Sequence, residues 1–419
     1  MRKNYVVGVD IGTQGTKAAV FRDEGSREGE AFEASRLIRR GTGTVWQEPD
    51  EIYGSVLRTI RKAVENSKVS PADIHAVGMD GQMAGIMAVD CEFEAVGAYD
   101  SWLDTRCEPY ISQMKAQAEE EIIRKTGGPV TYTHGPKILY RKQECPEEYK
   151  KIAKFVLPGV YAAGKMCGLK AEEAWVDYTH LHFSGFADNR KKEWDKGLLE
   201  EFQISSEKLP RIENPWTVVG RLTEPAAREC GLLPGTAVVA GCGDSAASAL
   251  GAGIVKKDMI YDVAGTASIF SCSTEQFTPD LKHKTLLFSR SVIDGLYTPL
   301  AYIGGGGMCL PWFIKQYGGT YGEWNEKATA ILAGSQGLYF VPHFSGRTCP
   351  NDPGMRGAFW GMDFIHTPAH MYRSILEGIA YEYSCYYRIL KEQNPQISPS
   401  CIYGAGGGAK SEIFCQIKA

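Results

Sequence analysis

The sequence predicts an α/β protein of two domains, and three observations lead to this fold class. Residues 5–21 and residues 259–271 each read as an apolar strand, a short turn containing Gly and Thr, and a second strand. Around them, strand patterns alternate with helical patterns, which is the order of elements in α/β proteins. A chain of 419 residues has room for two or three average domains, so a single small module is excluded. The repeated hairpin therefore indicates that one architectural unit occurs twice.

The other elements follow from hydrophobic periodicity and from residues that begin helices. A Pro-Asp pair precedes an amphipathic helix over residues 51–64, and a strand follows at residues 74–79. Residues 236–253 read as a buried strand, a glycine-rich turn and a helix of small residues that begins near Asp244. Residues 401–417 show the same order, with a cluster of glycines between the strand and the helix.

We place the domain boundary just before the second hairpin, so that residues 1–252 form the first domain and residues 253–419 the second. The last predicted helix stops at Ala419 without a residue that would end a helix. We therefore expect that the second domain is truncated.

Composition excludes several classes of protein. The chain has 46 Lys and Arg against 50 Asp and Glu, a formal net charge of -4, and no long basic block, so a nucleic-acid partner is not expected. The apolar runs are short and interrupted, and the N-terminus lacks the pattern of a signal peptide, so no membrane association is expected. Twelve cysteines are scattered without a CxxC pair, which indicates reduced thiols in a cytoplasmic protein.

The two Gly-Thr turns are candidate phosphate-binding sites, because a turn that exposes backbone N–H groups and a hydroxyl can hold phosphate oxygens. Lys17 would add positive charge beside the first turn. Asp10 ends the buried strand before that turn, where a carboxylate could bind Mg²⁺ or its waters. A polar hairpin tip without a ligand is the alternative interpretation of each turn.

Three more segments could carry chemistry. Asp244 lies among small residues where a strand gives way to a helix, so its carboxylate could accept a proton from a hydroxyl nucleophile or cap the helix. The glycines within residues 404–408 would let a nucleotide lie close to the backbone, although glycine turns between strands and helices are common. The glycines at 304–307 could approach a ribose or phosphates, or could serve only for packing at a helix start.

His180 and His182 raise the question of a metal site. Asp177 is the acid beside them, and no Cys or second acid completes a ligand set in this segment. We therefore expect polar residues on one face of a strand.

Taken in order, these segments resemble the motifs of the FGGY carbohydrate kinases. The resemblance extends from residue 5 to the end of the chain, and the C-terminal signature at residues 357–378 is its most specific part. The N-terminal signature departs from the family pattern, with Tyr140 where a tryptophan is usual. The matching motifs are DIGTQGTK (10–17) for the first phosphate motif, GCGD (241–244) for the catalytic aspartate, VAGTAS (263–268) for the second phosphate motif, and GAGGGAKS (404–411) for the adenosine motif.

The resemblance implies two ribonuclease H-like domains of the actin and hexokinase type, flanking a catalytic cleft that binds a sugar, with ATP above it. It implies phosphorylation of a sugar hydroxyl by ATP with Mg²⁺, with Asp244 as the catalytic base, and it allows a homodimer. Asp10 would be the metal ligand. By position, the residues expected to bind the nucleotide and its metal are Asp10, Gly12, Thr13, Gln14, Thr16, Lys17, Gly265, Thr266, Gly305, Gly407, Gly408 and Ala409.

The substrate segments at residues 78–90 and 99–107 resemble the xylulokinase branch of this family, which implies a ketopentose such as xylulose. Ala84 stands where a histidine is common in that branch, so the substrate can differ. Some of the candidates could be core residues, and the charged pair among them could be a structural ion pair. The residues expected to line the sugar pocket are Gln82, Met83, Trp102, Asp104 and Arg106.

Two other functions stay open at this point. One is a nucleotide-dependent switch related to actin, which the Trp-Leu-Asp-Thr-Arg segment at 102–106 and the C-terminal signature disfavour. The other is a sugar- or nucleotide-binding protein without kinase activity, which the ending at Ala419 suggests.

Overall fold

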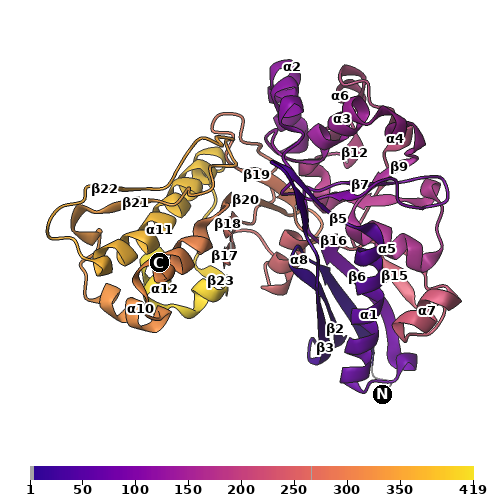
Figure 1. Ribbon diagram of the computed structural model, residues 1–419, viewed down its shortest axis with the longest axis horizontal. Helices are drawn as coiled ribbons and strands as arrows, with labels where there is room; N and C mark the ends of the chain where they lie inside the picture. The colour runs from indigo at the N-terminus through magenta and orange to yellow at the C-terminus, as the bar shows by residue number, and fades with distance from the viewer. Residues whose placement is uncertain (1–3, 266) are drawn as a thin grey trace. The chain divides into compact units, whose positions relative to one another are not determined.

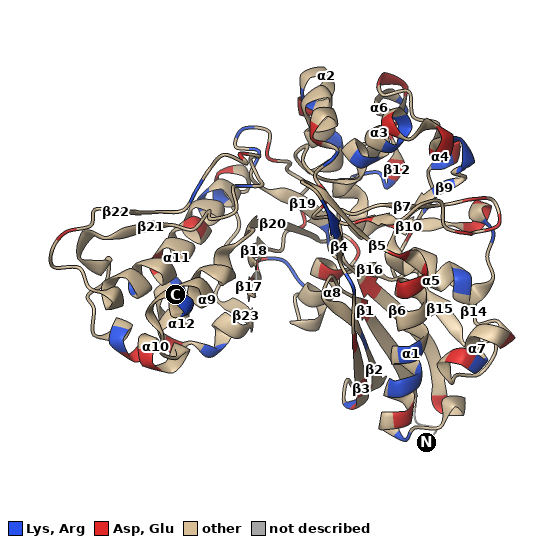
Figure 2. Cartoon of the chain, viewed as in Figure 1, with Lys and Arg blue, Asp and Glu red and all other residues tan. Residues whose placement is uncertain are grey.

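The computed structural model describes residues 4–265 and 267–419, and they form two units (Figure 1). One unit comprises the chain up to Thr126 together with Tyr132–Ser248, and the other comprises Gly127–Thr131 and Ala249–Ala419. The division thus falls inside a helix, whereas the sequence analysis placed it after residue 252. Figure 2 shows basic and acidic residues interspersed along both units.

The first unit is built on a seven-stranded mixed sheet with the order β14-β15-β6-β1-β2-β3 and with β16 beside β6. Strands β1, β2 and β3 pair antiparallel in chain order, and β6 pairs parallel to β1. Alternate residues of β1 lie in the core, because side chains of a strand point to opposite faces. The strands are β1 Tyr5–Ile11, β2 Gly15–Arg22, β3 Arg27–Ala34, β6 Ile74–Gly81, β14 Val218–Arg221, β15 Ala237–Val239 and β16 Cys242–Gly243.

The helix predicted at residues 51–64 is confirmed as α1, Pro49–Ser67. Pro49 suits the first turn of a helix, where its missing N–H needs no partner. Ile52, Val56 and Ile60 recur every four residues and are buried against the sheet. Lys68 ends the helix in the left-handed conformation and donates its N–H to the Glu65 carbonyl.

Shorter elements complete the first unit and bring loops to the ends of β1 and β6. One small sheet has the strand order β4-β5-β8, and two others pair β7 with β9 and β10 with β13. A further hairpin pairs β11 with β12. The strands are β4 Ile38–Arg40, β5 Thr44–Gln47, β7 Met87–Val89, β8 Tyr99–Asp100, β9 Lys154–Val156, β10 Trp175–Asp177, β11 Ala187–Asp188, β12 Glu193–Trp194 and β13 Arg211–Glu213. The helices are α2 Glu108–Thr126, α3 His134–Glu144, α4 Pro146–Lys151, α5 Pro158–Cys167, α6 Lys196–Glu201 and α7 Glu224–Cys230, with α8 Asp244–Gly251 at the division.

The second unit repeats the strand pairing of the first. Its five-stranded sheet has the order β19-β20-β18-β17-β23, in which β17, β18 and β20 pair antiparallel and β23 pairs parallel to β17. The predicted α/β class and the predicted repeat of the hairpin are therefore confirmed. The strands are β17 Ile260–Ala264, β18 Ser268–Cys272, β19 Leu287–Arg290, β20 Tyr297–Ile303 and β23 Ile402–Gly406, with a separate pair β21 Tyr339–Val341 and β22 Ala358–Trp360.

The long helix α11, Pro368–Gln393, is the main packing partner of that sheet's core. It lies so close to β21 that a methyl group on Gly378 would come within 2.3 Å of the Phe340 carbonyl oxygen. The other helices of the unit are α9 Cys309–Tyr317, α10 Tyr321–Thr329 and α12 Glu412–Lys418. Among all described residues, none of the helices combines the length and apolar composition that crossing a bilayer requires.

We expect opposite effects from the same substitution at two helical glycines. Gly378→Ala should destabilise the protein by about 1–3 kcal/mol, because the added methyl meets backbone that cannot move aside. Gly54→Ala in α1 should stabilise it by about 0.5–1 kcal/mol, because the methyl meets only the mobile end of Arg58 and the helix gains an alanine. Urea unfolding of both variants measures the difference, and equal effects would contradict the close approach of α11 to β21.

Candidate active site

The first phosphate motif forms the turn between β1 and β2. The Gly12 N–H donates to the Gly15 carbonyl at 3.0 Å, so the turn is confined to residues 12–14 and β2 already begins at Gly15. Asp10 pairs with Lys17 across the two strands, with 3.6 Å between Oδ2 and Nζ. Burial raises the pKa of the Asp10 carboxyl, and Lys17 opposes that shift.

Thr16 and Lys17 point to opposite faces of β2. The Thr16 side chain is buried, and its hydroxyl bonds Ser55 of α1 at 2.7 Å, whereas the Lys17 side chain is two-thirds exposed. Thr16 was predicted as a turn residue that binds phosphate. Because it lies inside β2 and faces α1, its hydroxyl is not part of the proposed phosphate site.

Thr13 connects the phosphate turn to two residues predicted to bind the sugar. Its hydroxyl donates to Gln82 Oε1 at 3.2 Å and accepts from the Trp102 indole N–H at 2.8 Å. Gln82 is buried and donates from Nε2 to Gln47 at 2.7 Å, which fixes the orientation of its amide. Trp102 is 40% exposed, so it is available to a ligand and is not a core residue.

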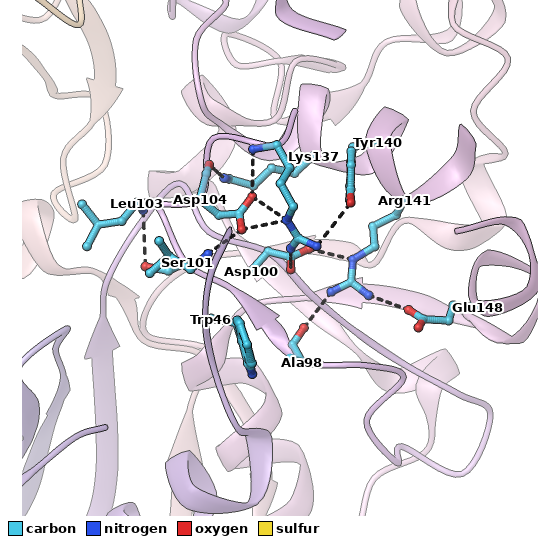
Figure 3. Close-up of polar contacts among 12 residues, drawn as sticks. Trp46, Ala98, Asp100, Ser101, Leu103, Asp104, Lys137, Tyr140, Arg141 and Glu148 are labelled. Atoms are coloured by element: carbon cyan, nitrogen blue, oxygen red, sulfur yellow. Dashed lines mark hydrogen bonds and ion pairs between the residues drawn. The ribbon is translucent and has the colours of Figure 1, made fainter. Parts of the chain in front are cut away.

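Asp104 and Arg106 form a salt bridge inside a larger network (Figure 3). The Arg106 Nε lies 2.9 Å from Asp104 Oδ2, and its Nη2 lies 2.6 Å from Asp100 Oδ1. The Asp104 Oδ2 also accepts the Val45 N–H at 2.8 Å, and Asp104 is 2% exposed. Hydrogen-bond donors of the protein therefore occupy both carboxylate oxygens of Asp104. Asp104 and Arg106 form a structural ion pair, one of the two interpretations that the sequence allowed.

Residues of α3 extend this network. Lys137 is buried and donates from Nζ to the Asp104 carbonyl at 2.6 Å. Arg141 bonds Asp100 Oδ2 at 2.7 Å, as Figure 3 shows. Tyr140, the residue that departs from the family's tryptophan, places its ring 4.9 Å from the Arg106 guanidinium. The Tyr140 ring thus stabilises the Arg106 guanidinium through a cation–π contact.

Asp244 begins α8 directly after β16. Its Oδ1 accepts the Ser245 N–H at 2.6 Å and the Ser245 hydroxyl at 3.2 Å, and among the described residues no hydrogen bond occupies Oδ2. A helix cap would bond the N–H groups one or two residues further on. Burial raises the pKa of the Asp244 carboxyl, Asp10 adds to the rise, and the Ser245 bonds and His180 oppose it.

Met83 and Gly243 shape the space beside this carboxylate. Met83 is 8% exposed, and a methyl group on Gly243 would lie 2.4 Å from the Met83 Cε. Met83 therefore packs against Gly243, the residue directly before Asp244. The absence of a side chain at Gly243 allows this close contact.

Asp80, the next-to-last residue of β6, is a further carboxyl group of the site that was not among the predicted site residues. The strand register sets Asp80 opposite Asp10 on one side and opposite Cys242 on the other. Burial, followed by the charges of Asp10 and Asp244, raises the pKa of Asp80 to about 8. A signal was present, because Asp80 lies within the substrate segment at residues 78–90.

The sequence analysis also misjudged the segment that carries His180 and His182. The expected strand is wrong: Tyr178–Phe183 form a 3-10 helix, η3, and both imidazoles are buried. Asp177 bonds His180 Nδ1 through Oδ2 at 2.6 Å. Among the described residues, no group of three His, Cys, Asp or Glu side chains could hold a metal ion.

In the second unit, three glycine segments predicted to bind nucleotide lie around one end of the sheet. Ala264 ends β17 and pairs with Gly406 at the end of β23, and a methyl group on Gly408 would lie 2.3 Å from the Ala264 Cβ. Gly305 follows β20, whose last residue pairs with the first residue of β18. Glycine segments therefore lie beside the end of β17 and beside the start of β18. Thr266 lies outside the described residues, whereas Gly265, Gly407 and Ala409 belong to the described segments.

Comparison with known proteins identifies related families and folds. The model of the N-terminal domain of the FGGY family of carbohydrate kinases matches residues 5–251, and the model of its C-terminal domain matches residues 263–419. Xylulose kinase of Bacillus subtilis is 28% identical, with 99% of this chain and 83% of that protein covered. Gluconokinase of the same organism is 24% identical over 99% of this chain and 82% of its own length.

Solved structures share the fold. A xylulose kinase from Rhodospirillum rubrum superposes with a TM-score of 0.90 at 23% identity, covering 99% of this chain and 84% of that one. A gluconate kinase from Lactobacillus acidophilus also gives 0.90, at 22% identity, covering 100% and 84%. The fold class of two ribonuclease H-like units, expected from the resemblance, is confirmed by these matches.

The network around Asp104 generates a stability prediction. Asp104→Ala should lower the free energy of unfolding by about 2–4 kcal/mol, because it leaves the Arg106 Nε–H and the Val45 N–H without their acceptor. Trp102→Phe, two residues away on an exposed side chain, should change it by less than about 0.5 kcal/mol. Denaturant unfolding of both variants tests this contrast. A stable Asp104→Ala protein would show that the aspartate serves a ligand instead of the fold.

Proposed function

This chain belongs to the FGGY family of carbohydrate kinases, and from that premise we propose that Asp244 activates a hydroxyl of a ketopentose such as xylulose for transfer of the ATP γ-phosphate. Sugar kinases of this family use ATP as the phosphate donor. The choice of sugar and the roles of the individual residues are the proposal.

One observation carries the assignment of roles: Thr13 of the phosphate turn is hydrogen-bonded to both Gln82 and Trp102 of the sugar segments. Two motifs that are far apart in the sequence thus meet within one unit. Met83, next to Gln82, packs against the glycine that precedes Asp244. A sugar held by Gln82 and Trp102 would therefore lie near a carboxylate and near a phosphate-binding turn.

Asp244 has the environment that a general base needs. Ser245 holds Oδ1, so Oδ2 is the oxygen that would accept the proton of the attacking hydroxyl. Burial raises its pKa, which strengthens the carboxylate as a base. Alignment of the hydroxyl and stabilisation of the phosphate charge would supply most of the rate.

Asp10 is the residue proposed to hold Mg²⁺, directly or through water. Its carboxylate is partly exposed at the end of β1, and carboxylate oxygens are the ligands that this hard cation prefers. Mg²⁺ usually takes one or two carboxylates together with phosphate oxygens and waters, so a complete protein cage is not required. The metal, when bound, would neutralise charge on the phosphates. Lys17 would support the same phosphates from the neighbouring strand.

For the nucleotide, we propose the glycine segments of the second unit. Gly407, Gly408 and Ala409 follow β23, and Gly265 and Gly305 border the same end of the sheet. Close contact at Gly408 excludes side chains there, which suits a surface on which a flat base can lie. Thr266 stays a predicted phosphate ligand on the basis of its sequence motif.

The preference for a ketopentose is supported by relatives named xylulose kinase, one of them 28% identical. Gluconokinases also match along the whole chain, so the sugar class is the finer part of the proposal. Gln82 and Trp102 are the proposed direct contacts. Arg106 and Asp104 are proposed to shape the pocket through their network. Ala84 supplies no hydrogen bond to the sugar from its side chain.

Two expectations about the cellular setting stay predictions. They are a cytoplasmic location, based on the scattered cysteines, and a homodimer, based on the resemblance.

A panel of sugars tests the proposed function. ADP release with ATP and Mg²⁺ should rise at least about tenfold with xylulose or another ketopentose, and less with gluconate and glycerol, because hydroxyl geometry decides substrate choice. A protein that hydrolyses ATP at the same rate with and without every sugar would contradict a carbohydrate kinase acting on this panel. Such a result would favour the nucleotide-dependent switch.

The assignment of the base is tested by Asp244→Asn. The amide cannot take the hydroxyl proton, so kcat should fall by about 10²–10⁴-fold while the Kd for ATP changes by less than about twofold. Asp23→Asn, which removes an exposed acid in the first unit, is the matched control and should retain wild-type kcat. Comparable turnover in Asp244→Asn would remove Asp244 from the proposed role.

A further inference from the structure

Four polar side chains of the first unit form a continuous chain of hydrogen bonds that starts at the phosphate turn. The Trp102 indole N–H donates to the Thr13 hydroxyl at 2.8 Å, and that hydroxyl donates to Gln82 Oε1 at 3.2 Å. Gln82 Nε2 in turn donates to Gln47 Oε1 at 2.7 Å. All three bonds therefore run in one direction, from Trp102 to Gln47.

This chain leaves the Thr13 hydroxyl without a free proton. An indole nitrogen can only donate, so the Thr13 oxygen accepts from Trp102. A threonine hydroxyl has one proton and two lone pairs, and Gln82 takes the proton. Thr13 is partly exposed at the turn, and its second lone pair is all that the hydroxyl can offer to a ligand. A group that carries a proton can bind there, whereas an ionised phosphate oxygen, which can only accept, cannot.

Rotation of the Thr13 hydroxyl toward a phosphate would leave a buried acceptor without its donor. Gln82 is 2% exposed, so water does not readily replace Thr13 at Oε1, and an unsatisfied buried acceptor is destabilising. Turning over the Gln82 amide alone would set its oxygen against the oxygen of Gln47, which is also 2% exposed. Gln47 thus holds the far end of the chain and keeps the Thr13 proton directed inward.

From these contacts we propose that the Thr13 hydroxyl binds the sugar and not the phosphates: its free lone pair accepts a hydrogen bond from a hydroxyl of the ketopentose. This inference rests on the proposed function. It changes the role that the sequence motif predicts for Thr13, which is that of a nucleotide-binding residue. The Trp102 side chain is 40% exposed and bonds the same oxygen, so a sugar that contacts Trp102 would lie beside Thr13.

Other groups of the same turn suit the phosphates. Within the part of the chain that the structure describes, no backbone carbonyl accepts the N–H of Thr13 or of Gln14. Exposed backbone N–H groups of a turn can hold phosphate oxygens. Lys17 is two-thirds exposed on β2 and adds positive charge. The turn would therefore bind phosphate through its backbone and sugar through the Thr13 side chain, which sets the two substrates side by side.

Thr13→Val and Thr13→Ser test this assignment by equilibrium binding. Valine has the shape of threonine without the hydroxyl, so the Kd for xylulose should rise about 3–10-fold, the effect of one lost hydrogen bond. The Kd for the non-hydrolysable ATP analogue AMP-PNP with Mg²⁺ should stay within about twofold, because no phosphate contact is removed. Serine keeps the hydroxyl, so Thr13→Ser should bind xylulose within about twofold of wild type. Isothermal titration calorimetry measures each Kd.

Lys17→Met is the comparison for a lost phosphate contact. Removing this positive charge should raise the Kd for AMP-PNP by at least about tenfold, because hydrogen bonds to charged groups are stronger than neutral ones. Thr13→Val should therefore bind AMP-PNP as the wild type does. A rise of about fivefold or more in that Kd would overturn the proposal, since it would mean that both amides are turned over and that Thr13 donates to phosphate.

The xylulose titration can overturn the proposal independently. An unchanged Kd for xylulose in Thr13→Val would do so, and so would equal weakening of both ligands together with a lower Tm, which would indicate a structural role. If the wild type phosphorylates none of the sugars, the proposed function fails. The AMP-PNP titration needs no turnover, so it still decides whether the Thr13 hydroxyl binds phosphate.

Discussion

The parallel pairing of β1 with β6 is the constraint on which the candidate active site depends. Its register sets Asp10 opposite Asp80, and β16 continues the pattern by pairing Cys242 with Asp80. Asp244 follows two residues later at the start of α8. Because parallel strands end at the same edge of a sheet, three distant segments deliver carboxyl groups to one place. The other groups of the site therefore act on these three clustered carboxyl groups.

Each of the three carboxyl groups has a different environment, and this difference gives them different chemical properties. Lys17 stands beside Asp10, Ser245 holds one oxygen of Asp244, and burial raises the pKa of Asp80 to about 8. Carboxyl groups whose environments push their pKa values apart can serve different purposes in one site. Asp10 and Asp244 are both partly exposed, and they differ in their partners: Lys17 faces Asp10, whereas Ser245 bonds a single oxygen of Asp244.

The sequence was sufficient where a local pattern determines structure, and insufficient where contacts between distant segments decide it. Both Gly-Thr hairpins, α1 and the helix at Asp244 follow from periodicity and turn residues. Thr16 was misplaced because one residue decides whether a side chain faces α1 or the solvent, and the strand start at Gly15 was not visible. Val45, which bonds Asp104, and Asp10, which stands opposite Asp80, come from other segments, so no spacing rule could reveal these contacts.

The two units show how one strand pairing can support two kinds of chemistry. In the first unit, the edge where β1 and β6 end carries Asp10 and Asp80, and Gln82 follows directly. In the second unit, the corresponding strands β17 and β23 end in Ala264 and Gly406, and glycines follow. The shared topology fixes only where the strands end. Polar side chains at that edge favour hydroxyl recognition and proton transfer, whereas bare backbone admits a flat base and phosphates. Under the proposed function, the repeated fold divides alcohol activation and nucleotide binding between its copies through a few residues at equivalent strand ends.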